Sequence, residues 1–133
     1  MARPTSDYPT ELELQILKLL WEKSPQTVRE IRDSLAENGR DLAHTSVITS
    51  MGTMVEKGQL KKLPPDVGKA FRFSPRLKQN DVSRGMLGDL VDRVYDGSTE
   101  NLMLNLFDIQ DLDETEIKRL RKLLNQKLRE QKS

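Results

Sequence analysis

Residues 27–75 read TVREIRDSLAENGRDLAHTSVITSMGTMVEKGQLKKLPPDVGKAFRFSP, and this stretch predicts the fold of the N-terminal half of the chain. Two helical patterns flank a turn at 40–44 and are followed by two short β patterns, at 59–63 and 70–74. The Pro/Gly loop at 64–68 cannot be helical and is typical of a hairpin. A helix-turn-helix followed by such a hairpin, the wing, is the layout of a winged helix. We therefore expect a mainly α fold with a small β-hairpin.

The second helix of this motif, predicted over 45–57, has two contrasting faces. Hydroxyl side chains at i, i+3 and i+7 share one face, at Ser46, Thr49 and Thr53. Apolar side chains lie on the opposite face, at Val47, Met51 and Met54. A solvated face usually carries Lys and Glu, whereas short Ser and Thr side chains let a helix sink into the major groove of DNA. The pattern predicts a DNA-recognition helix, with an ordinary solvated helix as the alternative.

The charge of the chain is unevenly distributed, although the formal net charge is only +1. Residues 40–78 contain 8 Lys/Arg and 3 Asp/Glu, whereas residues 79–133 contain 9 Lys/Arg and 11 Asp/Glu. The positive excess coincides with the predicted recognition helix and wing, as a nucleic-acid footprint requires. Ordinary variation in surface charge is the alternative explanation.

Composition excludes several classes of function. The chain has no cysteine and a single histidine, His44. These counts argue against disulfides, a thiol nucleophile, a Ser–His triad and Cys- or His-based metal sites. With no phosphate loop and no pocket-forming pair of carboxylates, we expect neither an enzyme nor a cofactor or metal site. No apolar run approaches the roughly 20 residues that span a bilayer, and no signal sequence opens the chain, so we place the protein in the cytosol.

Helix start signals lie before the motif and at its beginning. Residues 1–9 contain two prolines and are expected to form a mobile arm. Thr10 with Glu13, and Thr27 with Glu30, have the spacing of capping boxes, in which two backbone N–H groups are satisfied reciprocally. Each box is followed by an amphipathic apolar pattern, so two helices are expected to begin there.

Aromatic and basic residues alternate on the second strand of the wing. Phe71 and Phe73 flank Arg72, so the rings and the guanidinium point to opposite faces. We expect both rings to pack on the helices, which leaves Arg72 and Lys69 facing outward towards DNA phosphates.

A helical dimerisation domain is predicted at 79–133, after a winged-helix domain at 1–78. Helical spacing recurs at 80–96, the segment 99–107 is strongly apolar, and Asp113 opens a capping box before a last helix. Three short amphipathic helices cannot bury this much apolar surface alone. A partner chain with the same helices would cover it; packing against the winged helix in a monomer is the alternative. The predicted dimer interface consists of Leu87, Leu90, Val94, Leu102, Leu104, Leu106, Phe107, Ile117, Leu120 and Leu124.

Four segments of the chain resemble one known family. They read PTELELQILKLLWEKSPQTVREIRDSL, LAHTSVITSMGTMVEKGQL, GKAFRFSP and NLMLNLFDIQDLDETEIKRLRKLLNQ. Together they resemble the penicillinase-repressor (BlaI/MecI) family of winged-helix repressors over nearly the whole chain. The resemblance implies a homodimeric transcriptional repressor that binds inverted repeats in promoters, often those of antibiotic-resistance genes.

The resemblance also implies a mode of release. In the penicillinase systems a membrane-bound sensor peptidase leads to cleavage of the repressor, and the matching bond here is Asn105–Leu106. Members that are cut carry Phe where this chain has Leu106, so an answer to another signal stays open. Copper-responsive relatives carry a C-terminal cysteine cluster, and the absence of cysteine excludes copper sensing by that route.

The recognition helix departs from the family pattern at two positions. Family members often have a long polar residue and an arginine where this chain has Gly52 and Thr53. Gly52 lowers helix stability by roughly 1 kcal/mol relative to Ala. We therefore expect an operator that differs from those of the known repressors.

Direct DNA contacts are predicted for residues of the two helices and the wing. Thr45 would also cap the recognition helix and aim its amides at a phosphate; a cap alone is the alternative. His44 is either a phosphate donor or a partly buried turn residue. The predicted contact residues are His44, Thr45, Ser46, Thr49, Thr53, Lys69, Arg72, Thr27 and Arg29. A winged helix that only docks another protein is the competing function, and it would show exposed aromatic residues in this region.

Overall fold

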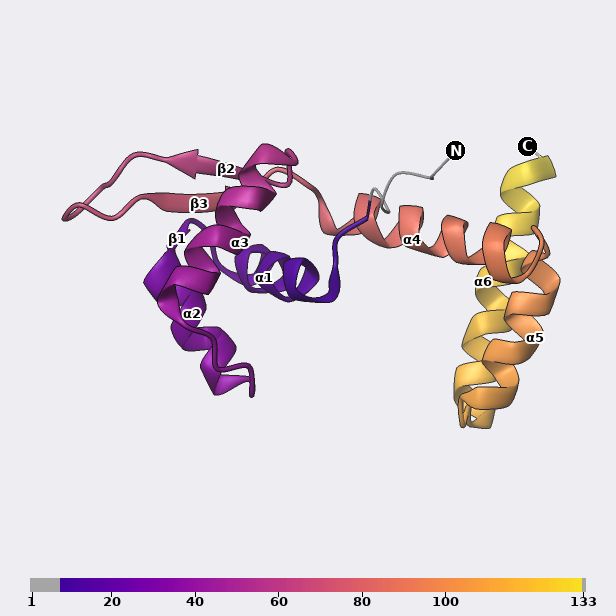
Figure 1. The fold of residues 1–133 in the computed structure, drawn as a ribbon. Coiled ribbons are helices and arrows are strands. Elements are labelled where there is room, and N and C mark those ends of the chain that lie inside the picture. Colours follow the sequence, from indigo (N-terminus) through magenta and orange to yellow (C-terminus); the bar gives the residue numbers. More distant parts are fainter. Residues whose placement is uncertain (1–7, 133) are drawn as a thin grey trace, which may run out of the picture. The chain divides into compact units, whose positions relative to one another are not determined.

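The computed structural model describes residues 8–132 (Figure 1). Most of the predicted N-terminal arm, residues 1–7, lies outside this range. The elements follow in the order α1 (Glu11–Glu22), β1 (Gln26–Thr27), α2 (Val28–Glu37), α3 (His44–Glu56), β2 (Leu60–Leu63), β3 (Arg72–Pro75), α4 (Gln79–Val94), α5 (Thr99–Ile109) and α6 (Glu114–Lys132). The fold is thus mainly α with a small antiparallel sheet, as the sequence predicts. Within residues 8–132, no helix is long and apolar enough to cross a membrane.

Contacts divide the chain into two compact units, one ending at Leu87 and the other beginning at Gly88. The boundary expected after residue 78 lies at the start of α4, and the contacts divide within that helix. The first unit holds α1 to α3 and the sheet, and the second holds the end of α4 with α5 and α6.

Two capping boxes fix where α1 and α2 begin, and they confirm the prediction. The Thr10 hydroxyl accepts a hydrogen bond from Glu13 N–H (3.2 Å), and the Glu13 carboxylate accepts one from Thr10 N–H (3.0 Å). Thr27 and Glu30 repeat the arrangement at 3.2 and 2.9 Å. Each box satisfies donors that the first turn of a helix leaves unpaired, and such a cap contributes about 1 kcal/mol.

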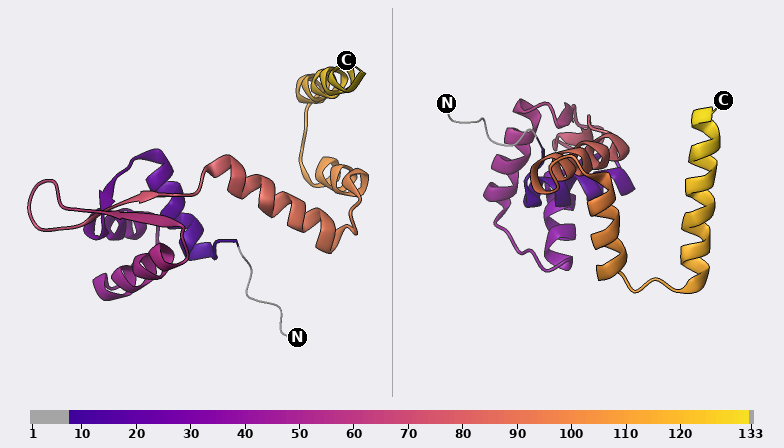
Figure 2. Two further views of the ribbon diagram at one scale, coloured as in Figure 1. Left: turned by 90° about the horizontal axis from the view of Figure 1, so that it is seen from above. Right: turned by 90° about the vertical axis from the view of Figure 1, so that its right-hand side faces the viewer.

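The core of the first unit is formed by the apolar faces of α1, α2 and α3 with side chains from β2 and β3. Figure 2 shows the helices of this unit gathered beside the hairpin. The buried members of the core are Ile16, Leu17, Leu20, Ile31, Leu35, Val47, Met51, Met54, Leu60 and Phe73. The three from α3 are fully buried, and burial of each such side chain contributes about 1.5–3 kcal/mol. Because this face of α3 is anchored in the core, the opposite, hydroxyl-rich face must point to solvent.

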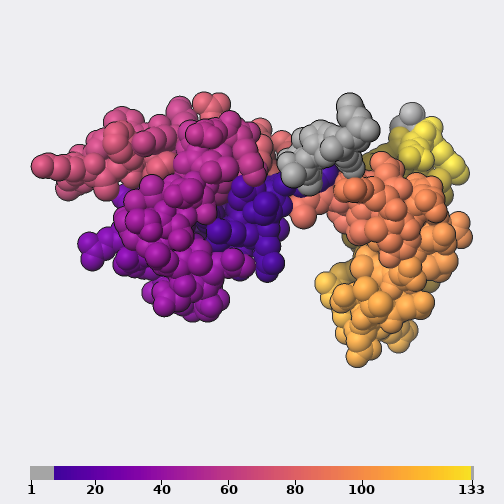
Figure 3. All heavy atoms as spheres, in the orientation of Figure 1, coloured from indigo at the N-terminus to yellow at the C-terminus, as the bar shows by residue number. Residues whose placement is uncertain are grey.

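β3 is the central strand of a three-stranded antiparallel sheet with the order β1-β3-β2. Leu63 pairs with Arg72 at the loop end of the hairpin, and Gln26 pairs with Phe73 across the other edge of β3. The sequence did not predict β1, because two residues are too few to show an alternating pattern. β2 and β3 begin one and two residues later than predicted, and the loop between them protrudes as the tip of the wing (Figure 3).

The predicted cap of the recognition helix is wrong. Ala43, and not Thr45, is the N-cap of α3. Its backbone is extended, and its carbonyl accepts hydrogen bonds from the N–H groups of Ser46 and Val47 (3.0 and 3.2 Å). Thr45 lies inside the first turn, and no side chain caps α3. The backbone becomes helical directly after Ala43. The start of α3 is therefore not set by a hydroxyl side chain that caps it.

The prediction for the wing aromatics is correct for Phe73 and wrong for Phe71. Phe73 is buried in the core, whereas Phe71 is 48% exposed. Phe71 precedes Arg72, the residue of β3 nearest the loop that still pairs with β2. Beyond that pair the hairpin extends past the helices, and Lys62 covers the Phe71 ring with its Nζ 4.3 Å from the ring centroid.

The second unit consists of helices joined by two short turns. Asp96 and Gly97 have positive φ angles (50° and 82°) and end α4. Ser98 Oγ and Asp113 Oδ1 accept hydrogen bonds from first-turn N–H groups of α5 and α6, at 3.1 and 2.8 Å. The strongly apolar segment predicted at 99–107 forms most of α5. No described residue of α5 or α6 is buried, and most of their apolar side chains are exposed.

Candidate nucleic-acid interface

Most exposed residues of α3 between His44 and Glu56 have small or hydroxyl side chains, and Ile48 is the exception. The small or hydroxyl residues are Thr45, Ser46, Thr49, Gly52 and Thr53, all exposed. The contrast of faces predicted from the sequence is therefore present in the structure. Short side chains allow the helix backbone to come close to a flat partner such as the edges of base pairs.

The hydroxyl of Thr49 is oriented by the helix itself. Thr49 Oγ1 donates to the Thr45 carbonyl at 3.0 Å, a bond that Ser and Thr often make inside helices. The hydroxyl proton is thus committed to the backbone, whereas the lone pairs of the oxygen can still accept a hydrogen bond. Thr49 is suited to accept from a base or to pack its methyl group against a thymine methyl.

No internal contact requires glycine at position 52. A Cβ built on Gly52 would meet no atom within 4 Å, and glycine in a helix costs about 1 kcal/mol relative to alanine. Packing within the described chain therefore does not explain why residue 52 is a glycine. It leaves the backbone bare in the middle of the exposed face.

The two phosphate candidates of the wing differ in their freedom to reach a partner. Arg72 Nε donates to the Pro64 carbonyl at 3.1 Å, so Arg72 holds the wing loop and has its terminal NH₂ groups left to offer. Lys69 is exposed and makes no hydrogen bond or ion pair within residues 8–132. Lys69 is the freer of the two cations.

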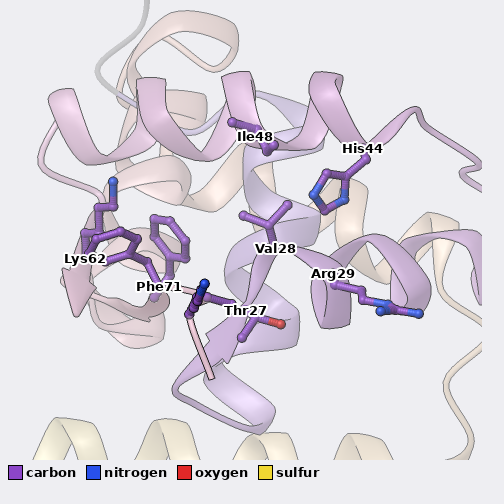
Figure 4. Close-up of a pocket in the computed structure, with 10 residues that line it drawn as sticks. Thr27, Val28, Arg29, His44, Ile48, Lys62 and Phe71 are labelled. Carbon is purple, nitrogen blue, oxygen red and sulfur yellow. The ribbon is translucent and has the colours of Figure 1, made fainter. Parts of the chain in front are cut away.

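A hollow of about 420 Å³ lies between α3, the start of α2 and the wing (Figure 4). The side chains of His44 and Ile48 point into it from α3 towards Val28 of α2. Four of the predicted contact residues line the hollow: Thr27, Arg29, His44 and Lys69. The other five lie outside its lining: Thr45, Ser46, Thr49, Thr53 and Arg72. The predicted residues thus lie in three places: on the exposed face of α3, along the lining of the hollow, and at Arg72, which is bonded to the wing loop.

Sequence reasoning missed the apolar part of this hollow. Ile48 is 47% exposed, and it could have been found as the one isoleucine beside Thr49 on a face of hydroxyl residues. Phe71 could not be found, because its exposure depends on where the hairpin leaves the helices. An exposed aromatic is what a protein-docking wing would show, but here the ring lies under the Lys62 cation.

A polar network behind the exposed face fixes the end of α3 to α1. Glu13 Oε2 lies 2.8 Å from Lys57 Nζ, and Glu13 Oε1 accepts from Gln59 Nε2 at 3.2 Å. Burial raises the pKa of Glu13, but hydrogen bonds from Lys57, Thr10 N–H and Gln59, with the Lys57 charge, outweigh burial, so the pKa lies below its ordinary 4.5. The Glu13–Lys57 pair joins residues 44 positions apart, beyond the reach of local sequence patterns.

A helix-turn-helix made by α2 and α3, followed by the β2–β3 wing, defines the winged-helix class of DNA-binding domains. The family model described as penicillinase repressor matches residues 9–126. The chain therefore belongs to the penicillinase repressor family, which confirms the resemblance seen in its sequence segments. This is a family of transcriptional repressors and not of enzymes.

Individual relatives share modest identity with the chain over most of its length. The methicillin resistance regulatory protein MecI of Mammaliicoccus sciuri is 24% identical over 115 residues, which cover 86% of this chain and 91% of MecI. The transcriptional regulator BlaI of Mycobacterium tuberculosis is 27% identical over 108 residues, covering 80% and 76%. Among solved structures, the adhesin competence repressor AdcR of Streptococcus pyogenes aligns over 98% of this chain and 86% of its own, with 16% identity and a TM-score of 0.48.

Proposed function

We propose that this repressor acts in the cytosol as a homodimer and binds an inverted-repeat DNA operator through α3 and the wing. The observation that carries the proposal is the exposed face of small residues on α3, held outward by three fully buried side chains on the opposite face. A helix with such a face fits the major groove, which is about 12 Å wide.

The predicted contact residues fall into two roles. Thr45, Ser46, Thr49 and Thr53 approach base edges and the nearest phosphates, because they lie on the face that enters the groove. The remaining contacts are to phosphates, and they come from Thr27, Arg29, His44, Lys69 and Arg72. Since phosphate contacts release counterions, binding should weaken steeply as salt is raised.

The second unit supports dimerisation because many of its apolar side chains are exposed. Leu104, Ile117 and Leu124 are each more than half exposed. A hollow of about 500 Å³ between α5 and α6 is lined in part by Phe107, Ile117, Leu120 and Leu124. Further interface candidates are Leu87, Leu90, Val94, Leu102 and Leu106. Burial of each such side chain against a partner would contribute up to about 1.5–3 kcal/mol. Linking two winged helices in one dimer raises the affinity for two half-sites without new contacts in either.

Cleavage between Asn105 and Leu106 is the release step that family membership suggests, with a sensor peptidase as partner. Both residues are exposed, and Asn105 Nδ2 lies 3.3 Å from Tyr95 OH. The bond lies inside α5, whereas proteolysis favours exposed loops, so α5 must open locally before it is cut. A cut there would detach α6 and its share of the dimer interface.

Replacement of Thr49 by Glu tests the placement of the recognition helix. A carboxylate on the exposed face of α3 would meet DNA phosphates and bases, so specific binding should be abolished in a mobility-shift assay at near-physiological salt. Ala36→Glu is the matched control, because Ala36 is exposed on α2 and the substitution adds the same charge outside the proposed interface. Circular dichroism checks that both variants fold. Retained operator binding by Thr49→Glu would show that α3 does not read DNA.

A further inference from the structure

The hollow beside α3 has an apolar interior. Val28, Ile48, Phe71 and Phe73 contribute to its lining, from α2, α3 and the wing (Figure 4). Ile48 and Phe71 are 47% and 48% exposed, although they lie beside a well-packed core. Exposed apolar surface of this kind is favourably covered by an apolar partner. At about 420 Å³, the hollow falls within the roughly 300–1,000 Å³ range of small-molecule sites.

The rim of the same hollow is positively charged. Arg29, Lys62 and Lys69 line it, and no Asp or Glu does. In the described part of the chain, neither the Arg29 side chain nor the Lys69 side chain forms an ion pair or hydrogen bond with another residue. An anion at the edge of the apolar surface would be within reach of Lys69, and of Arg29 once the Arg29 side chain turns in from the outward direction that Figure 4 shows. Charge-assisted hydrogen bonds to both cations would be strong. A cation would be repelled.

We propose that this hollow binds a small amphipathic carboxylate, with an aromatic or branched apolar body against Ile48 and Phe71 and its carboxylate towards Arg29 and Lys69. The site also lies within the proposed DNA interface, because Arg29, His44 and Lys69 belong to both. Bound carboxylate and bound DNA therefore exclude each other, and the ligand acts as an inducer that needs no proteolysis. This regulatory consequence rests on the proposed function; the binding itself does not.

The first test measures binding of 2-naphthoate to the full chain by calorimetry, with naphthalene-2-carboxamide as a neutral probe of the same shape. A ligand of this size should bind at about 1 mM or tighter. We expect saturable binding of one naphthoate per chain, at least tenfold tighter than binding of the amide. Amide chemical-shift changes should concentrate in α3 and the wing. Failure to saturate, or equal affinity for the amide, would overturn the proposal.

Variants locate the site. The double substitution Arg29→Gln with Lys69→Gln should weaken naphthoate binding at least tenfold, whereas Lys61→Gln with Arg76→Gln should change it less than twofold. The control removes two exposed charges from the same unit outside the lining. Equal effects of the two pairs would mean that naphthoate responds only to net charge, which would refute a built site.

The second test adds operator DNA. Naphthoate should displace DNA from the protein, and matched concentrations of sodium chloride or of the amide should not. If naphthoate and DNA bind together, the exclusion is wrong while the ligand site stands. If the chain binds no specific DNA but still binds naphthoate, the proposed function fails and the carboxylate site does not.

Discussion

Replacing Lys57 with Met should destabilise the first unit by about 1–2 kcal/mol at neutral pH. The substitution keeps an unbranched apolar stem but removes the ammonium 2.8 Å from Glu13, whose side chain is only 8% exposed. Breaking a fully buried ion pair costs about 3–5 kcal/mol, whereas an exposed pair contributes about 0.2–1 kcal/mol. The Lys57 side chain is 47% exposed, so solvent screening places the expected loss between these limits.

The pH dependence of this loss follows from the pKa of Glu13. Burial raises that pKa, but the hydrogen bonds from Lys57, Thr10 N–H and Gln59, with the Lys57 charge, lower it more, so it lies below 4.5 in the folded protein. A depressed carboxyl pKa contributes stability that is fully present above the unfolded value, 4.5, and is lost as pH falls through the folded value. The difference between the wild type and Lys57→Met should therefore shrink as the medium becomes more acidic than about pH 4.

Urea unfolding followed by tryptophan fluorescence measures the effect. Trp21 is the only tryptophan, and its Nε1 donates to the Leu77 carbonyl at 2.8 Å, so its emission reports on the first unit. Lys61→Met is the control, because Lys61 is exposed on β2 and its side chain makes no hydrogen bond or ion pair within residues 8–132. The reasoning is refuted if Lys57→Met loses no more stability than this control, or loses as much at about pH 3 as at neutral pH.

Three further predictions concern DNA binding and assembly. Gly52→Ala should stabilise the chain by about 1 kcal/mol, because the new Cβ meets no atom inside the protein. The same Cβ would enter the groove of the DNA, so operator binding should weaken. Denaturant titration measures the first effect and mobility shifts the second, and unchanged operator affinity would contradict the second. Replacing the thymines nearest Thr49 with uracil should weaken binding by up to about fourfold per methyl removed; equal affinity for both DNAs would exclude methyl contacts. A chain that ends at Asn105 should be monomeric at micromolar concentration by analytical ultracentrifugation, and a persistent dimer would show that α6 is not needed.

Local interactions explain why much of the fold could be predicted. The Thr10–Glu13 and Thr27–Glu30 boxes each act over three residues, so the sequence alone predicts where α1 and α2 begin. The apolar faces of the first three helices repeat with the helical period, and every member expected on the inner face of α3 is fully buried. The outward direction of the hydroxyl face follows from that burial.

Features that depend on distant residues could not be predicted. β1 exists only because Gln26 and Thr27 pair with β3. Glu13 carries the sequence signature of a cap alone, but the fold also brings Lys57 and Gln59 to its carboxylate. The error at Thr45 has the same origin, since the point at which α3 begins depends on the path of the chain from α2.

Selection of genomic DNA fragments by the purified protein at near-physiological salt, in parallel with Thr49→Glu, tests the central claim most directly. The wild type should enrich fragments that share a short inverted repeat upstream of genes, and the variant should enrich none of them. Recovery of no common sequence by the wild type, or of the same repeat by the variant, would contradict DNA reading by α3.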